Sequence, residues 1–590
     1  MQILSARTIA ARVGARSYSA EQIATETLAR AAAYDAIQPQ AWIYRLPHEQ
    51  VLAQARRVDE RIAAGEQLPL AGVPFAVKDN IDAAGIPTTA ACPEFSYVPG
   101  ESATVVERLM AAGAVLIGKT NLDQFATGLV GTRSPYGAPT CVFNRDYVSG
   151  GSSSGSAVLV AAGVVAFALG SDTAGSGRVP AAFNNLFGLK PTKGRWSSRG
   201  MVPACRSLDC ITTLTNSADD AALVDQVSSA FDPADAYSRR EPATRDSVGA
   251  SFRFGVPRPE QLNFFGDEEA PALFRAARDR LVRCGGKPVE IDVTPLTRAA
   301  QLLYSGPWVA ERTAALEEFL KTHSGAIHPV VRAIVQGGKG VSAVEAFKGF
   351  YALQAYMRDA EAMWEGIDVL LLPTTPTIYR VSELLAEPVG LNSNLGFYTN
   401  FVNLLDMSAV AVPAGFRGNA TGFGVSLIGP AWADRALLDL ARRYETVAPL
   451  PAAPDLCRVL KPKTIELAVV GAHLAGMPLH WQLTSRAARL SRSTRTAPTY
   501  RLYAMKGTTP PKPALVHSAS GGGAIELEVY ELEVAAFGSF VAEVPAPLAI
   551  GTVVLEDGST VHGFVAEPRA MEGAEDITAM GGWRAYMSSR

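Results

Sequence analysis

The pattern of apolar positions divides the chain into a helical start, a long stretch of alternating strands and helices, and a tail of short strands. Apolar residues recur at helical spacing over 21–34 and 48–64, which predicts two amphipathic helices. Two short apolar runs further along, 72–77 and 114–117, have the length of buried strands, and a helical segment at 104–112 separates them. This order predicts an α/β fold in which helices cover both faces of a large mixed sheet.

The same alternation continues to about residue 450, and we expect one large domain over residues 1–450. The elements that continue the alternation are a predicted helix at 157–163, a strand at 164–169, two further helices at 270–281 and 345–364, and a strand at 368–373.

The pattern of residues changes near the end of the chain. Prolines are dense from 448 to 454, which is typical of an extended linker, and we place this linker at 451–464. Four short apolar or alternating segments then predict strands, at 466–470, 525–534, 540–544 and 552–555. Residues 465–590 are therefore expected to form a separate, small α+β domain.

Composition excludes several classes of protein. Of 590 residues, 48% are hydrophobic and 19% charged, and the formal net charge is −3, so there is no basic footprint for nucleic acid. No apolar run reaches the ~20 residues of a membrane span, and the start lacks the apolar region of a secretory signal. The six cysteines have no metal-binding or disulfide spacing. We expect a cytoplasmic protein without cofactor or metal, which binds neither nucleic acid nor membranes.

Two runs of small residues, 150–156 and 171–178, are the clearest chemical signal. A Gly/Ser run is usually a flexible linker, but apolar helix and strand signals lie between these two, so we expect both to be buried. Such turns bring backbone N–H groups close to an anion. Phosphate is one possible anion, although no P-loop sequence is present. The other use is an oxyanion hole, formed by the N–H groups of Thr173, Ala174, Gly175 and Ser176.

A serine nucleophile in such a turn needs a base. Only three of the seven histidines precede residue 470, and none belongs to an HExxH motif. Lys78, at the end of an apolar strand, is the alternative, because burial lowers the pKa of a lysine. By its position alone, a lysine at a strand end is most often solvated.

Together these residues resemble the amidase signature family over about residues 20–450. Members share a Gly/Ser-rich core and a Ser–Ser–Lys triad. The resemblance assigns Lys78 as the base, Ser152 as a bridging serine held by a cis peptide bond, and Ser176 as the nucleophile. The two serines are 24 residues apart, which is the family spacing.

Around the nucleophile the chain departs from most members, because Ser176 is followed by Gly177 and Arg178 instead of Ile-Arg. This variant and the appended domain resemble the allophanate hydrolase branch. The resemblance implies hydrolysis of the amide of allophanate (urea-1-carboxylate) with release of ammonia, and a functional link to urea carboxylase, which makes allophanate. It also implies a C-terminal domain similar to γ-glutamyl cyclotransferase-like folds.

The segment 303–312 resembles the one with which this branch binds the substrate carboxylate, and it supplies Tyr304 and Arg312. Eight residues are about two helical turns, so both side chains could lie on one face of a helix. The alternative is a core tyrosine and a surface arginine. Because the triad residues are present, we favour a role in substrate binding.

In the C-terminal domain His473 follows an apolar strand and a glycine. Histidine is suited to proton transfer near neutral pH, and the branch's appended domain is assigned decarboxylation of the N-carboxycarbamate product. Packing by His473, or a domain that only dimerises the chain, are equally open.

Two other functions stay open for the whole chain. It could be another amidase of the family or the glutaminase-type subunit of a tRNA amidotransferase, which shares the core but needs partner chains and lacks this C-terminal domain. It could also be a catalytically dead binding module, which the intact triad disfavours. We expect a symmetric homodimer.

Overall fold

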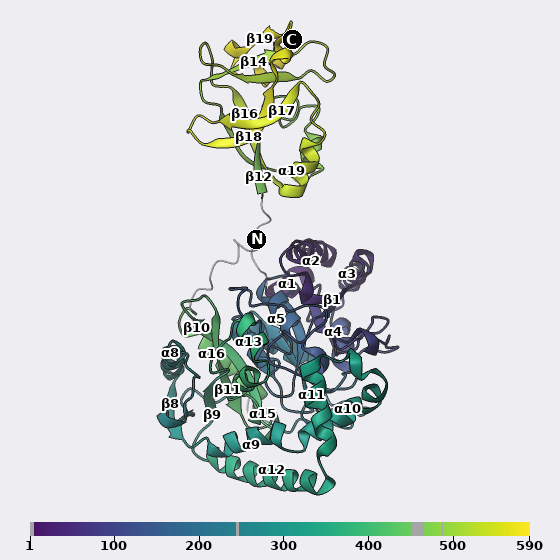
Figure 1. Ribbon diagram of the computed structural model, residues 1–590, viewed down its shortest axis with the longest axis vertical. Helices are drawn as coiled ribbons and strands as arrows, with labels where there is room; N and C mark the ends of the chain where they lie inside the picture. Colours follow the sequence, from purple (N-terminus) through teal and green to yellow (C-terminus); the bar gives the residue numbers. More distant parts are fainter. Residues whose placement is uncertain (1–4, 244–246, 451–463, 487, 590) are drawn as a thin grey trace. The chain divides into compact units, whose positions relative to one another are not determined.

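The computed structural model describes residues 5–243, 247–450, 464–486 and 488–589. The chain divides into two compact units, Met1–Leu456 and Cys457–Arg590, each with its own sheet (Figure 1). The predicted linker falls almost entirely on 451–463, which lies outside the described residues. Its last residue, Thr464, already begins a strand.

An eleven-stranded sheet forms the centre of the first unit. In spatial order its strands are β1 (Trp42–Arg45), β3 (Val115–Thr120), β2 (Pro74–Lys78), β4 (Phe167–Asp172), β6 (Cys210–Thr215), β5 (Phe187–Lys190), β10 (Ser408–Phe416), β11 (Gly422–Gly429), β9 (Val369–Pro373), β7 (Phe252–Pro257) and β8 (Gly286–Ile291). The pairs β2–β3, β2–β4, β7–β8 and β7–β9 are parallel and the other pairs are antiparallel, which confirms the predicted mixed sheet.

Helices surround this sheet. Every residue of β2, β3, β4, β5, β6, β9 and β11 is buried. Because neighbouring residues of a strand point to opposite faces, both faces of the sheet must be covered. The helices are α1 (Ala6–Gly14), α2 (Ala20–Asp35), α3 (His48–Ala63), α4 (Thr104–Ala111), α5 (Ser154–Ala161), α6 (Arg178–Phe183), α7 (Ala218–Ser228), α8 (Ala270–Arg283), α9 (Thr294–Ser305), α10 (Trp308–His323), α11 (Pro329–Gly337), α12 (Ala343–Met363), α13 (Val381–Ala386), α14 (Gly390–Leu395), α15 (Phe401–Leu404) and α16 (Asp434–Thr446).

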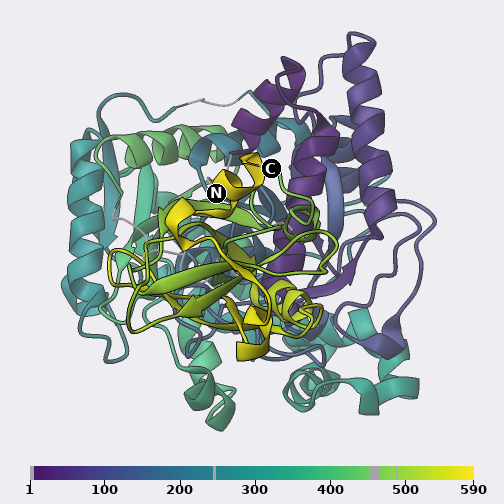
Figure 2. The same cartoon turned by 90° about the horizontal axis from the view of Figure 1, so that it is seen from above.

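The predicted helices and strands of this unit are present, with ends displaced by up to three residues. The two amphipathic helices of the N-terminal part are α2 and α3, which lie side by side in purple in Figure 2. The strand predicted at 164–169 begins only at Phe167, because α5 ends in a turn around Gly163, whose φ is +68°. Within the described residues no helix is long and apolar enough to cross a membrane.

The second unit is mostly β, which corrects the α+β prediction. Its five-stranded sheet has the order β13 (Arg489–Arg495), β16 (Glu526–Glu533), β12 (Thr464–Val469), β18 (Thr560–Ala566) and β17 (Leu548–Val554). A three-stranded sheet consists of β15 (Pro513–His517), β14 (Tyr500–Ala504) and β19 (Glu575–Asp576). The named helices described here are short: α18 (Trp481–Thr484), α19 (Val534–Val541) and α20 (Trp583–Ser588).

The strand predicted at 540–544 is wrong. Its first two residues end helix α19, and a turn follows. Phe537 and Phe540 are three residues apart, so they project from one side of a helix toward the core, where Phe540 makes an edge contact with Phe564. A short apolar run fits a strand and a buried helix turn equally well, and here the packing decides.

Candidate active site

The candidate base lies where two neighbouring parallel strands end. Strand β2 pairs with β4, Val77 opposite Leu169, so the residues that follow on both strands meet at one edge of the sheet. Lys78 is the last residue of β2, and its Nζ donates to the hydroxyl of Ser171, near the end of β4, at 2.8 Å. The strand pairing therefore turns the lysine toward the Gly/Ser-rich segments.

The first of these segments brings Ser152 to the lysine. The peptide bond between Gly151 and Ser152 is cis, and Lys78 Nζ donates to Ser152 Oγ at 2.7 Å. Position 151 requires glycine, because a Cβ there would lie 2.2 Å from Asp123 Oδ2. Two of the three predicted triad residues are thus in direct contact.

Lys78 is fully buried, at 0% exposure. Burial lowers the pKa of Lys78 to about 7, although the carboxylates of Asp123, Asp172 and Asp209 act in the opposite direction. A large fraction of this lysine is therefore uncharged near neutral pH, which is the state that can accept a proton.

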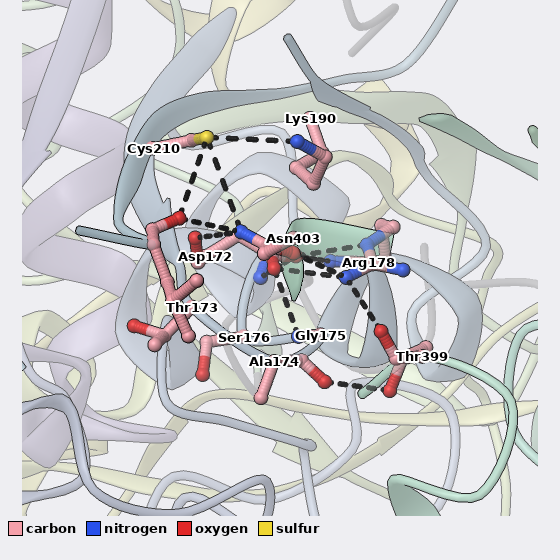
Figure 3. A network of polar contacts seen from close by, with 12 residues as sticks. Asp172, Thr173, Ala174, Gly175, Ser176, Arg178, Lys190, Cys210, Thr399 and Asn403 are labelled. Carbon is pink, nitrogen blue, oxygen red and sulfur yellow. Dashed lines mark hydrogen bonds and ion pairs between the residues drawn. The ribbon is translucent and has the colours of Figure 1, made fainter. Parts of the chain in front are cut away.

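The second segment is a tight turn built around the Asp172 carboxylate (Figure 3). This carboxylate accepts the backbone N–H of Gly175 at 2.8 Å and that of Gly177 at 3.1 Å. It also pairs with the guanidinium of Arg178, with contacts of 2.9 and 3.0 Å. All of these groups are buried, so the backbone on both sides of Ser176 is fixed.

Side chains from a later part of the chain hold the same turn next to Arg178 (Figure 3). Asn403, on α15, donates to the Asp172 carbonyl at 2.8 Å, and the Thr399 hydroxyl donates to the Ala174 carbonyl at 2.7 Å. Gly175 has φ +127°, and a Cβ on it would lie 2.4 Å from Thr399 Oγ1. The turn therefore requires glycine at this position.

The predicted oxyanion donors differ in availability. The N–H of Gly175 is committed to Asp172. The N–H groups of Thr173, Ala174 and Ser176 have no acceptor among the described residues, so these three can bind a negatively charged oxygen.

The hydroxyl of the candidate nucleophile, Ser176, points toward Gly128 in this structure. The Ser176 hydroxyl donates to the Gly128 carbonyl at 3.3 Å, and within the described chain it has no hydrogen bond to the Ser152 hydroxyl. The two segments are linked through the backbone, because the Ser153 N–H donates to the Ser176 carbonyl at 3.1 Å. Proton transfer from Ser176 to Ser152 therefore requires the Ser176 side chain to leave the Gly128 carbonyl.

Tyr304 and Arg312 do not share one helix, which corrects the expected geometry. Tyr304 lies on α9 and Arg312 on α10, because Gly306 and Pro307 end the first helix and start the second. The two side chains nevertheless meet, with the guanidinium carbon 5.9 Å from the centre of the Tyr304 ring. The break between α9 and α10 thus allows the side chains of Tyr304 and Arg312 to meet.

Arg312 is buried at 3% exposure, so it is not a surface arginine. Its Nη1 donates to the Thr127 hydroxyl at 3.1 Å, and its buried Nε has no partner in the described structure. Thr127 precedes Gly128, whose carbonyl holds the Ser176 hydroxyl. The guanidinium and the candidate nucleophile thus contact neighbouring residues of one loop.

Two known protein families match the chain, one in each unit. A sequence model of the family described as Amidase matches residues 23–438, and one described as Allophanate hydrolase C-terminal domain matches residues 465–588. The chain belongs to the amidase family. Each of its two units thus has a counterpart among known domains.

Individual relatives of this amidase cover between two thirds and nearly all of it. Urea amidolyase of Saccharomyces cerevisiae is 45% identical over 92% of the chain, which spans only 31% of that protein. A structure of Kluyveromyces lactis allophanate hydrolase is 42% identical, with a TM-score of 0.68, and the match covers 97% of this chain and 99% of the other. A glutamyl-tRNA(Gln) amidotransferase subunit from Thermosynechococcus vestitus is 34% identical over 68% of the chain and 89% of its own length.

In the second unit of the amidase, His473 lines a cavity of about 190 Å³ together with Gln482, Lys512 and Phe564. Its Nε2 is 2.7 Å from Gln482 Oε1, and its ring stacks on Phe564 with centroids 5.1 Å apart. Burial lowers the pKa of His473, so the imidazole is neutral at physiological pH. The histidine both packs and faces a cavity.

Sequence reasoning missed several residues of the amidase site. Ser171 and Asp123 were not predicted, although Ser171 contacts the lysine and Asp123 accepts the N–H groups of Val130, Gly131 and Arg133 at 3.0 to 3.1 Å. Ser171 has a sequence signal, because it stands at a strand end in the second small-residue run. Asp123 has none, since its contacts depend on how the loop after β3 folds.

Proposed function

We propose that this chain is an allophanate hydrolase, which cleaves the amide of allophanate and releases ammonia. The observation that carries the proposal is Arg312, a buried cation with no carboxylate in salt-bridge contact among the described residues, next to the loop that holds Ser176. A cation buried in this way favours a negatively charged ligand. The similarity to Kluyveromyces lactis allophanate hydrolase and to yeast urea amidolyases supports the same substrate.

In the proposed reaction Ser176 Oγ attacks the carbonyl carbon of the terminal amide. The Ser176 proton passes through the Ser152 hydroxyl to neutral Lys78, which is 2.7 Å from Ser152 Oγ. The N–H groups of Thr173 and Ala174, with that of Ser176, hold the oxyanion, and each such donor contributes about 3 kcal/mol. Lys78 returns the proton as ammonia leaves, and water then hydrolyses the acyl-enzyme.

Specificity is proposed to come from the other end of the substrate. Allophanate is small and planar, with a carboxylate opposite the reacting amide. A guanidinium binds a carboxylate through two parallel N–H···O bonds. Arg312 supplies this group, and the ring of the exposed Tyr304 faces the guanidinium at 5.9 Å.

For the second unit we propose the following step. Hydrolysis leaves N-carboxycarbamate, a dianion that loses carbon dioxide after it takes up a proton. His473 and Lys512 line the same cavity: Lys512 supplies a cation for the second carboxylate, and His473, after taking up a proton from solvent, passes it to the dianion. The likeness of this unit to γ-glutamyl cyclotransferase-like folds also remains a proposal.

Ammonia release by the purified chain tests the main proposal. Allophanate should be hydrolysed in preference to glutamine, asparagine and simple aliphatic amides. Preference for glutamine would instead favour the glutaminase-type function, for which the similarity to the tRNA amidotransferase subunit is the supporting observation.

The second step is tested by following ammonia and carbon dioxide separately. His473→Ala should leave ammonia release unchanged while carbon dioxide release lags, whereas His517→Ala in the same unit should affect neither. Matched release of both products in His473→Ala would leave the unit a structural role.

The last part of the proposal concerns partners. We propose a symmetric homodimer, to be tested by light scattering on the purified chain. Urea carboxylase is the proposed source of allophanate, and a coupled assay that starts from urea should release ammonia only when both enzymes are present.

A further inference from the structure

One buried carboxylate next to the site has no part in the proposed reaction. Asp209 stands directly before β6, which pairs with β4 so that Cys210 lies opposite Asp172. The next residues at that end of the ladder are Asp209 on one strand and Thr173 on the other. The register of the sheet therefore places this carboxylate beside the first residue of the nucleophile turn.

The contacts of Asp209 fix it firmly. The Thr173 hydroxyl donates to its Oδ1, and the backbone N–H groups of Ala204 and Cys205 donate to its carboxylate at 2.8 Å and 3.1 Å. Only 8% of the residue is exposed. Thr173 thus begins the turn with its side chain anchored, while its own N–H remains available for an oxyanion.

The charge of Asp209 acts on two residues of the proposed site, Lys78 and Arg312. Burial raises the pKa of Asp209 to about 6, so the group is still mainly ionised at neutral pH. Its charge raises the pKa of Lys78 and, together with other neighbouring groups, that of Arg312. Other groups near it are Cys205 and Glu311 and, around the cavity that Asp209 lines, Lys193, Arg206, Arg239 and Asp406.

We infer that Asp209 is a positioning residue for amide hydrolysis: it anchors the oxyanion turn through Thr173 and places a negative charge at the strand end that Lys78 contacts. The inference rests on the proposed function only in that the site hydrolyses amides. It does not depend on allophanate being the substrate, because the turn and the lysine act on any amide.

The test compares Asp209→Asn with Thr173→Val. Asp209→Asn keeps an oxygen that can accept the Thr173 hydroxyl but removes the charge. Because that charge raises the pKa of Lys78, its loss should move the acid limb of the kcat profile to lower pH by about 0.5 unit. Thr173→Val should leave the acid limb in place and lower kcat on the order of 10- to 100-fold with little change in KM.

Asp434 offers a matched control. It is a buried carboxylate that accepts the hydroxyl and N–H of Thr192 at 2.7 and 2.8 Å, and the carboxylates that act on Lys78 are those of Asp123, Asp172 and Asp209. Asp434→Asn should therefore lower the melting temperature without moving the acid limb. If Asp209→Asn behaves in the same way, or if folded Thr173→Val has wild-type kcat, the inference is wrong.

Two further experiments test the role of Asp209 independently of which amide is the substrate. If the wild type hydrolyses glutamine or a simple amide but not allophanate, the proposed substrate fails, and the same variants are compared on that amide. A fluorophosphonate labels Ser176 when the Ser176 oxygen attacks phosphorus and fluoride leaves, so the pH dependence of this labelling reports on the base without any amide. An unshifted limb in Asp209→Asn in that assay would overturn the role of the charge.

Discussion

Replacing Arg312 with leucine separates substrate recognition from the chemical step. Arg312 is 3% exposed, and within the described residues its guanidinium donates one hydrogen bond, to Thr127, while Nε has no partner. Its removal therefore costs few contacts within the protein. A bound carboxylate would lose its buried cation. Removing one partner of a buried ion pair costs about 3–5 kcal/mol, so kcat/KM for allophanate should fall roughly 150- to 5000-fold.

The assay compares allophanate with a neutral amide that still turns over. Since a neutral amide presents no carboxylate, Arg312→Leu should change its kcat/KM by less than about tenfold. Arg312→Lys should lie between the wild type and Arg312→Leu on allophanate, because it keeps the charge but loses the planar fork.

Arg133 provides a matched comparison, because it is buried like Arg312 but both of its terminal nitrogens bond to backbone carbonyls. It lies on the same loop and donates to the backbone carbonyls of Thr127 at 3.1 Å and Pro388 at 2.6 Å. Arg133→Leu should therefore reduce activity on both substrates by the same factor. If Arg312→Leu also gives equal losses on both, the carboxylate-binding role of Arg312 is refuted.

Three other outcomes are expected of the first unit. Ser176→Ala should abolish ammonia release and Lys78→Ala should nearly do so, and wild-type-like turnover in either would contradict the mechanism. Because burial lowers the pKa of Lys78 to about 7 and only the neutral amine accepts a proton, kcat should rise with pH through about 7; a flat profile from pH 5 to 9 would exclude the lysine as base. Gly175→Ala should lower both the melting temperature and kcat, since its Cβ would lie 2.4 Å from Thr399 Oγ1; unchanged values would show that the turn tolerates a side chain.

Much of the first unit could be predicted from the sequence because its signals are local. Periodic apolar runs, Ser19 before α2 and Ser342 before α12, each in a capping box, mark the helices without any knowledge of the tertiary fold. The contact between Lys78 and Ser152 could be expected only from the resemblance to the amidase signature family, since by its position alone a lysine at a strand end is most often solvated.

Other features depend on tertiary packing and have no local signal. Nothing around Asp209 in the sequence marks it as a partner of Thr173, since the contact follows from the register of β4 and β6. The meeting of Tyr304 and Arg312 was predicted on the wrong geometry, although Gly306 and Pro307 between them are a visible helix break. The spacing of two residues predicts that they share a face only when both lie on the same helix.

In the proposed mechanism, reaction and recognition are carried by different parts of the chain. Lys78 and Ser176 depend on β2, β4 and the Asp172 turn, in which a Cβ at Gly151 or Gly175 would collide with Asp123 or Thr399. Such contacts leave little freedom for sequence change.

Arg312 and Tyr304 stand instead on α9 and α10, which meet the site from outside the sheet. A side chain on these helices can change without moving the turn, so substrate choice can diverge while the reaction stays the same. The match to both an allophanate hydrolase and a tRNA amidotransferase component is what this separation predicts.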